Sequence, residues 1–156
     1  MRSRGRGVVL LDTNVLVYAH DPRNKAKQEL AIQVLDHLAT RRMAVLSSQV
    51  LGEFFVVATR KLPDPLPTEE AAAQVERFLR YFPVLEVTGT VVLEACRGVR
   101  QHRLAYWDAQ IWATARLNAV PLVLSEDFSD GLFLEGVTFR NPFLPSFDLS
   151  SAAGEG

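Results

Sequence analysis

Four short stretches of the chain place a carboxylate where a strand should end or a helix should begin. The stretches are 8–14, 47–55, 104–113 and 122–131, and their acids are Asp12, Glu53, Asp108 and Asp127. In an open α/β sheet, the carboxyl ends of the strands and the loops that leave them form one crevice, so distant acids can meet there. Carboxylates gathered in one crevice resist ionisation unless a cation is present. A hard divalent ion, Mg²⁺ or Mn²⁺, is the expected cofactor, and its expected chemistry is metal-assisted cleavage of a phosphodiester.

Each acid also has a purely structural interpretation. Asp12 could cap a helix or close an Asx turn, and Asp108 could interact favourably with a helix dipole. Glu53 could pair with a bridging arginine, because its helix is apolar almost all round and an unpaired charge there is costly. The acids at 126, 127 and 130 could form a polar surface turn. All of these interpretations would have to hold at once, so the four acids together favour a site.

Composition limits the class of protein. A chain of 156 residues with 48% hydrophobic and 22% charged residues is typical of one globular domain, expected over 1–145 with a flexible tail over 146–156. The net charge of −1 excludes a polycation, so any affinity for nucleic acid must come from local patches. The single cysteine, Cys96, excludes an internal disulfide and fits a reducing cytosol. No apolar run approaches the length of a membrane span, so we expect a cytoplasmic protein without membrane contact.

Short apolar runs alternate with helical patterns along the chain. Strands are expected over 8–11, 43–47, 84–87, 121–124 and 137–140, and helices after residue 24, over 48–62, from 68, over 90–101 and over 105–118. Pro63–Pro67 must be a loop, after which Thr68 should cap a helix that buries Ala72, Val75, Phe78 and Leu79. This order predicts a three-layer α/β/α sandwich with a mostly parallel sheet of about five strands.

A run of large apolar residues, Phe54 to Val57, exceeds what one face of a helix can bury. We therefore expect exposed apolar surface around the 63–67 loop and on the helices beside it. Such a surface would serve dimerisation or the docking of a partner protein.

The segments LLDTNVLVYA, HRLAYWDAQIWATA and LSEDFSDG, with a Glu53 helix ending in RKL, carry a family resemblance. In order and spacing they resemble the PIN-domain family of metal-dependent ribonucleases, and most closely its VapC-type toxins of bacterial toxin–antitoxin pairs. The resemblance extends from Val8 to about Phe143. It implies a metal bound by the four acids, RNA as the substrate, a homodimer, and a small antitoxin protein that covers the site.

The resemblance also suggests roles for residues beside the acids. It implies Thr13 and Ser125 as hydroxyls that orient the metal ligands, with Asp130 as a peripheral or neighbouring group. Three basic residues of the segment 97–103, Arg97, Arg100 and Arg103, are candidates to hold flanking RNA phosphates. For His102 in the same segment, a solvated helix end is the favoured role and contact with phosphate the more specific one.

Two other functions remain open. One is a non-catalytic domain of the same fold that binds RNA or a partner. The other is a phospho-accepting receiver of a signalling pathway, which also gathers acids at strand ends. Receivers need a lysine late in the chain, whereas the lysines here are Lys25, Lys27 and Lys61. A metal-dependent cleavage assay would separate the enzyme from the binding domain.

Overall fold

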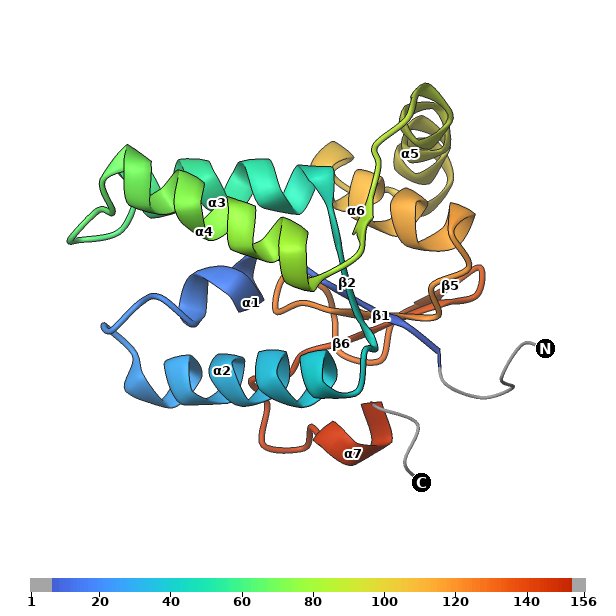
Figure 1. Cartoon of the computed structure of the whole chain (residues 1–156). Coiled ribbons are helices and arrows are strands. Elements are labelled where there is room, and N and C mark those ends of the chain that lie inside the picture. The colour runs from blue at the N-terminus through green and yellow to red at the C-terminus, as the bar shows by residue number, and fades with distance from the viewer. Residues whose placement is uncertain (1–6, 153–156) are drawn as a thin grey trace.

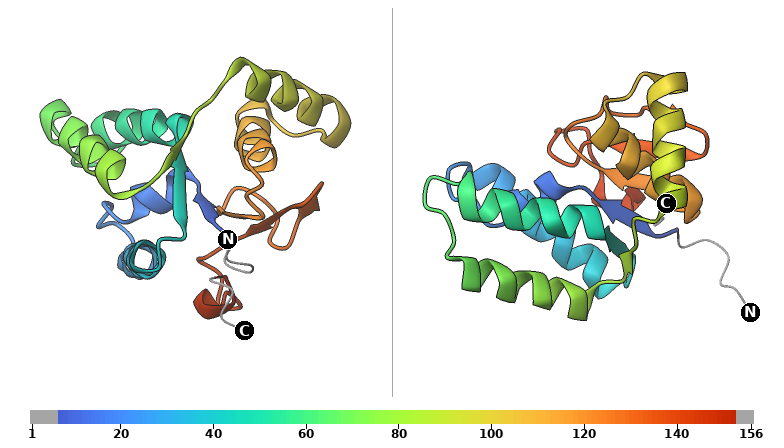
Figure 2. Two further views of the ribbon diagram at one scale, coloured as in Figure 1. Left: turned by 45° about the vertical axis from the view of Figure 1, so that its right-hand side comes forward. Right: turned by 90° about the horizontal axis from the view of Figure 1, so that it is seen from above.

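The computed structural model describes residues 7–152 and contains a six-stranded sheet between two groups of helices (Figures 1 and 2). The strands are β1 (Val9–Leu11), β2 (Ala44–Ser47), β3 (Val84–Leu85), β4 (Leu122–Leu124), β5 (Phe133–Leu134) and β6 (Val137–Arg140). The helices are α1 (Thr13–Tyr18), α2 (Lys25–Thr40), α3 (Ser48–Arg60), α4 (Thr68–Tyr81), α5 (Gly89–His102), α6 (Tyr106–Leu117) and α7 (Leu149–Ala152). The predicted fold class is confirmed.

The order of strands in the sheet is β3-β2-β1-β4-β6-β5, and every pair is parallel except β5 with β6. Helices α1 to α4 pack together as one group, and α5 packs on α6 as the other. The left view of Figure 2 shows these groups on opposite sides of the strands. Right-handed connections explain this division. The chain passes from β1 to β2 through α1 and α2 and from β2 to β3 through α3 and α4, and it then returns in the opposite direction from β3 to β4 through α5 and α6.

Strand β1 lies in the centre of the sheet between β2 and β4. Its three residues are fully buried, as their continuous apolar character predicts for a strand covered on both faces. Leu11 is paired with Leu124, so β1 and β4 end at the same level. Asp12 and Ser125, the next residues of the two strands, therefore leave the sheet side by side.

Helix α4 differs from its prediction in register. Pro67 occupies the N-cap position and makes no side-chain cap, while Thr68 is already helical. Phe78 is buried as expected, but Ala71 is buried in place of Ala72, and Leu79 is 55% exposed. Among the helices, α4 makes its main contact with α3 alone, so only a narrow stripe of it is covered.

Three short elements were not predicted, and the first is helix α1, which occupies a stretch where no helix was expected. Strand β5 forms a hairpin with β6 through Glu135 and Gly136, both of which have positive φ. Helix α7 lies within the segment expected to be a flexible tail, and Phe147 and Leu149 pack against the core. Residues 153–156 of that expected tail, and residues 1–6, lie outside the described part. Within 7–152, no helix combines the length and apolarity that crossing a membrane requires.

Candidate active site

Asp12 ends β1 and is the N-cap of α1. Its side chain is only 4% exposed, and its Oδ1 accepts a hydrogen bond from the backbone N–H of Thr13 at 2.7 Å. Its Oδ2 accepts from the Ser125 hydroxyl at 2.6 Å. Burial raises the pKa of Asp12 to about 6 against the lowering effect of these hydrogen bonds, and the charges of Asp127 and Glu53 raise it further. The capping role expected of an aspartate here is real, but it leaves the carboxylate buried beside two other acids.

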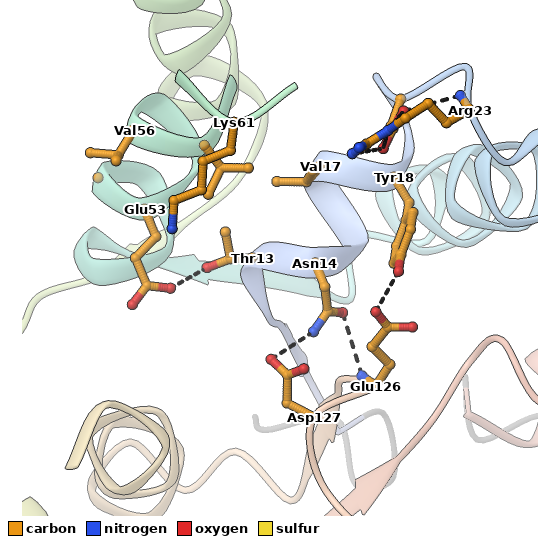
Figure 3. Close-up of a pocket in the computed structure, with 13 residues that line it drawn as sticks. Thr13, Asn14, Val17, Tyr18, Arg23, Glu53, Val56, Lys61, Glu126 and Asp127 are labelled. Carbon is orange, nitrogen blue, oxygen red and sulfur yellow. Dashed lines mark hydrogen bonds and ion pairs between the residues drawn. The ribbon is translucent and has the colours of Figure 1, made fainter. Parts of the chain in front are cut away.

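Glu53 lies one turn into α3 and faces α1 across the site (Figure 3). Its Oε2 accepts a hydrogen bond from Thr13 Oγ1 at 2.6 Å, and its Oε1 accepts from Gln49 Nε2 at 2.9 Å. Its hydrogen-bond partners are thus neutral side chains. The alternative in which a bridging arginine neutralises Glu53 is wrong for the described residues.

Asp127 follows β4 and is exposed. Its Oδ2 accepts a hydrogen bond from Asn14 Nδ2 at 3.2 Å, and its backbone N–H donates to Ser125 Oγ at 3.0 Å (the Asn14 contact is drawn in Figure 3). Asn14 Nδ2 also reaches Ser125 Oγ at 3.2 Å. Ser125 therefore joins Asp12, Asn14 and Asp127 in one hydrogen-bonded group.

Asp108 lies in the first turn of α6 and is half-buried. Burial raises its pKa above the ordinary value, and the charges of Asp127 and Glu53 raise it further. The same two acids act on Asp12. Four acids from four separate parts of the chain thus influence one another electrostatically.

Among the described residues, no ion pair compensates the charge of these four acids, although Arg23 and Lys61 line the cavity beside Glu53 and Asp127. None of the ion pairs between described residues includes Asp12, Glu53, Asp108 or Asp127. Over the same residues, no three His, Cys, Asp or Glu side chains are arranged to hold one metal ion. The oxygen donors suit Mg²⁺ or Mn²⁺ in type, but both oxygens of Asp12 and of Glu53 already accept hydrogen bonds, as does Oδ2 of Asp127. A common metal position for the four acids stays a prediction.

Two cavities border the acids. One, of about 590 Å³, is lined by polar residues of α1 and the loop after β4, including Asn14 and Asp127, and by apolar residues such as Val17 and Val56. The other, of about 500 Å³, lies between α3 and the start of α6. Gly52 and Glu53 line both cavities. An extended ligand could therefore run from one cavity to the other past Glu53.

Of the residues predicted to lie beside the acids, Thr13 donates a hydrogen bond to Glu53 and Ser125 donates one to Asp12. Asp130 instead accepts from the Asn141 backbone and from Arg140, which lower its pKa, and these contacts connect it to β6 rather than to the four acids.

The three candidate phosphate-binding arginines lie on or just after α5. Arg97 is engaged in ion pairs with Glu94 and Glu135. Arg100 and Arg103 are exposed, and Arg103 ends the helix in the left-handed conformation with φ 56°. None of the three makes a hydrogen bond or ion pair to the four acids.

Sequence reasoning missed the amides that position the acids. Gln49 stands four residues before Glu53, a spacing that places both on one face of a helix and could have indicated the contact. Asn14 lies in the first turn of a helix capped by Asp12, but its partners are 111 and 113 residues away. Gln110 donates to Gln49 Oε1 at 2.8 Å across 61 residues. No local signal indicates these long-range contacts.

Known proteins show which family this chain belongs to. The family model of the PIN domain matches residues 9–129. No curated protein matches the chain significantly.

Several solved structures share the fold. A toxin–antitoxin complex from Klebsiella pneumoniae is similar over 86% of this chain and 97% of its own, with 20% identity and a TM-score of 0.64. VapBC2 from Rickettsia felis, bound to a DNA fragment from its promoter, covers 86% of this chain and 98% of its own, with 16% identity and a TM-score of 0.62. VapC20 from Mycobacterium tuberculosis, a sarcin–ricin-loop-cleaving toxin, covers 74% and 86%, with 18% identity and a TM-score of 0.56. With a family model that spans most of its length and a fold that agrees, the chain belongs to the PIN domain family.

Proposed function

We propose that this PIN domain is a metal-dependent endoribonuclease and the toxin of a toxin–antitoxin pair. One observation carries the proposal: four carboxylates from α1, α3, α6 and the loop after β4 share one neighbourhood in which no described basic side chain pairs with them. Such charge is costly unless a cation joins it. A divalent cation is the partner that would relieve the cost and bring RNA phosphates to the acids.

Asp12, Glu53, Asp108 and Asp127 would hold the ion. When bound, Mg²⁺ or Mn²⁺ makes water a stronger nucleophile and stabilises charge on the phosphate and the leaving oxygen. Binding also favours ionised ligands, so the ion would lower the pKa of the Asp12 carboxyl from its raised value of about 6.

Neutral side chains keep the acids in place. The Ser125 hydroxyl fixes Asp12 Oδ2, the Thr13 hydroxyl fixes Glu53 Oε2, and Asn14 fixes Asp127. Each contact limits the rotation of a carboxylate without neutralising it. Glu53 and Asp127 would exchange some of these hydrogen bonds for the ion, because the same oxygens serve both.

Two observations support the substrate and partner. The similar structures include toxin–antitoxin complexes and a toxin that cleaves the sarcin–ricin loop. Apolar side chains are exposed on the two helices that the 63–67 loop connects, with Val56 on α3 and Leu79 and Tyr81 at the C-terminal end of α4. We assign this surface to a homodimer contact or to a small antitoxin, and Arg100 and Arg103 to flanking RNA phosphates.

The alternatives have different standing. The receiver interpretation fails, because the chain belongs to the PIN family. The non-catalytic binding domain predicts RNA binding without cleavage. The site favours the enzyme over it, because neither stability nor simple RNA binding is served by four uncompensated acids.

The experiment compares the purified protein with Asp12→Asn on single-stranded RNA, with Mg²⁺ and with EDTA. Metal-dependent cleavage by the parent alone supports the enzyme, whereas equal activity of the two proteins, or full activity in EDTA, overturns it. Light scattering on the isolated protein and a pull-down with a co-encoded small protein test the partners. A strict monomer that binds no such protein would refute that part of the proposal.

A further inference from the structure

An exposed tryptophan stands directly beside the candidate active site. Trp107 is 63% exposed and precedes Asp108 in the first turn of α6. The other tryptophan, Trp112, is fully buried one turn further along the same helix. Exposing a large indole to water is unfavourable, so this position suggests a role in binding.

Trp107 lines the cavity of about 500 Å³ between α3 and α6. That cavity shares Gly52 and Glu53 with the larger one, which also contains Asp127. A Cβ added at Gly52 would meet nothing within 4 Å, so the backbone of α3 is bare where the two cavities join. A flexible chain that passes the acids can therefore continue past Gly52 to the indole.

Hydrogen bonds connect the position of Trp107 to that of Glu53. Gln49 Nε2 donates both to the Trp107 carbonyl at 3.1 Å and to Glu53 Oε1 at 2.9 Å. The Tyr106 ring packs edge-on against the indole, with centroids 4.9 Å apart. The Gln49 amide and the Tyr106 ring thus fix the position of Trp107 relative to Glu53.

We propose that Trp107 stacks an unpaired nucleobase of the RNA, next to the phosphate held at the acids; this rests on the proposed function. Three features favour a nucleobase as the occupant: a flat exposed ring, a cavity, and continuity with the proposed site for phosphate. Unpaired bases are commonly bound by stacking on aromatic side chains, and every base offers a π-face.

The site is not built to read the edge of the base. Both hydrogens of the Gln49 amide are already donated, and its oxygen accepts from Gln110. Gln110 is itself bonded to the Tyr106 hydroxyl at 2.9 Å. Trp107 should therefore add affinity for single-stranded RNA with little dependence on sequence.

The first test measures binding without cleavage. Short RNA pentanucleotides of each base are titrated in EDTA, where the proposed metal-dependent cleavage cannot occur, with the parent, Trp107→Phe, Trp107→Ala and Phe133→Ala. Phe133 is a matched control, because it is an aromatic residue, 64% exposed, on the edge strand β5 and outside the cavities described. We expect saturable quenching of tryptophan fluorescence in the parent and in Phe133→Ala, and none in Trp107→Phe, where only buried Trp112 remains. In anisotropy measurements with labelled oligonucleotides, Trp107→Ala should raise the Kd fivefold or more for every base, because the stacking of one base is lost.

The second test separates this inference from the proposed function. On RNA hairpins with randomised loops, Trp107→Ala should raise KM fivefold or more while kcat changes little, with partial rescue by Trp107→Phe. A parent that cleaves while Trp107→Ala keeps its KM and Kd overturns the stacking role and leaves the nuclease intact. A parent that never cleaves refutes the nuclease, while the quenching still tests the stacking. If Trp107→Ala changes the oligomeric state in light scattering but not Kd, the indole serves contact between copies and the inference is wrong.

Discussion

Two groups of acidic side chains in this small domain are treated in opposite ways. Around the C-terminal part of α5, Glu94 pairs with Arg97 and Arg116, and Glu135 pairs with Arg97 and His102. We call these five residues the paired cluster. At the other site, Asp12, Glu53, Asp108 and Asp127 have no such basic partner in the described part of the chain.

The electrostatics follow this difference. In the paired cluster, hydrogen bonds from His102 and then from Arg97 lower the pKa of Glu135. At the candidate active site, burial and neighbouring acids raise the pKa of Asp12 and Asp108. The chain has arginines enough to pair one set of acids closely, so the missing compensation at the other set is a property of that site. Leaving these acids without basic partners lowers the stability of the fold, and proteins commonly accept such a loss at functional sites.

The largest expected effect is on catalysis. Asp12→Asn keeps the volume and the fold but removes a ligand from the candidate active site, so RNA cleavage in Mg²⁺ should fall by about 100-fold or more. Glu94→Gln, in the paired cluster, should cleave at nearly the parental rate. Initial rates on one RNA measure both, and equal losses would remove the functional distinction between the groups.

Mg²⁺ should also distinguish them by thermal unfolding. An ion that binds only the folded state raises the Tm, so Mg²⁺ should stabilise the parent and Glu94→Gln alike, and Asp12→Asn less. A Tm increase that is the same in all three proteins would mean that the ion does not bind at Asp12.

The response of stability to pH should have opposite signs in the two groups. The pKa of Asp12 is about 6 in the folded state against an ordinary 3.8, so ionisation of Asp12 lowers the free energy of unfolding. This loss of stability is absent below about pH 4, grows as the pH rises to 6, and reaches about 3 kcal/mol at most. Glu135 has a lowered folded pKa, so its contribution is present above its ordinary pKa of 4.5 and is lost as the pH falls through the folded value.

Urea unfolding in EDTA from pH 3.5 to 7.5 checks both signs. The advantage of Asp12→Asn over the parent should appear as the pH rises, and the deficit of Glu135→Gln should shrink as the pH falls below 4.5. Parallel curves for the parent and Asp12→Asn would show that Asp12 ionises freely.

A smaller effect is expected where α5 packs on α6 beneath the paired cluster. A Cβ at Gly98 would lie 2.8 Å from two atoms of the Trp112 ring, which contacts Arg97 and His102. Gly98→Ala should therefore destabilise the protein by about 1–3 kcal/mol. Gly52→Ala, in open space on α3, should stabilise it by up to about 1 kcal/mol. Denaturant midpoints compare the two, and a neutral Gly98→Ala would mean that the helices can separate without cost.

The smallest effect belongs to the paired cluster itself. Glu94→Gln leaves Arg97 and Arg116 with one acceptor fewer in a largely covered position, so we expect a loss of about 1 kcal/mol. Raising the salt concentration should reduce that loss. If Glu94→Gln is more stable than the parent, the desolvation of the Glu94 carboxylate costs more free energy than its interactions with Arg97 and Arg116 contribute.

Much of the fold was predictable because the central strands are buried on both faces. Such strands appear as continuous apolar runs, and the acids that follow them could be assigned to one crevice by topology alone. The β5–β6 hairpin was missed because its turn is Glu135-Gly136, and a glutamate at positive φ lacks the usual Asn or Asp signal. The buried positions of α4 depend on which stripe α3 covers, which α4's own sequence does not specify.

The site was predictable in its acids and not in its other contacts. Each acid follows a local pattern of strand end or helix start, whereas Asn14, Gln110 and the Glu135 partner of Arg97 are brought in by segments far away in sequence. Arg97 illustrates the difference. Its basic segment suggests phosphate binding, but the guanidinium already pairs with Glu94 of α5 and with Glu135 of the β5–β6 hairpin.

The parallel pairing of β1 with β4 also governs when the site comes into being during synthesis. Asp12 emerges from the ribosome early, but Ser125, which bonds to it, is made 113 residues later. Until β4 has been translated and inserted beside β1, a nascent chain lacks Asp127 and one wall of the site. Such a distant pairing closes slowly compared with local helices. If the protein cleaves RNA as proposed, the growing chain would lack the complete set of acids until β4 has paired with β1.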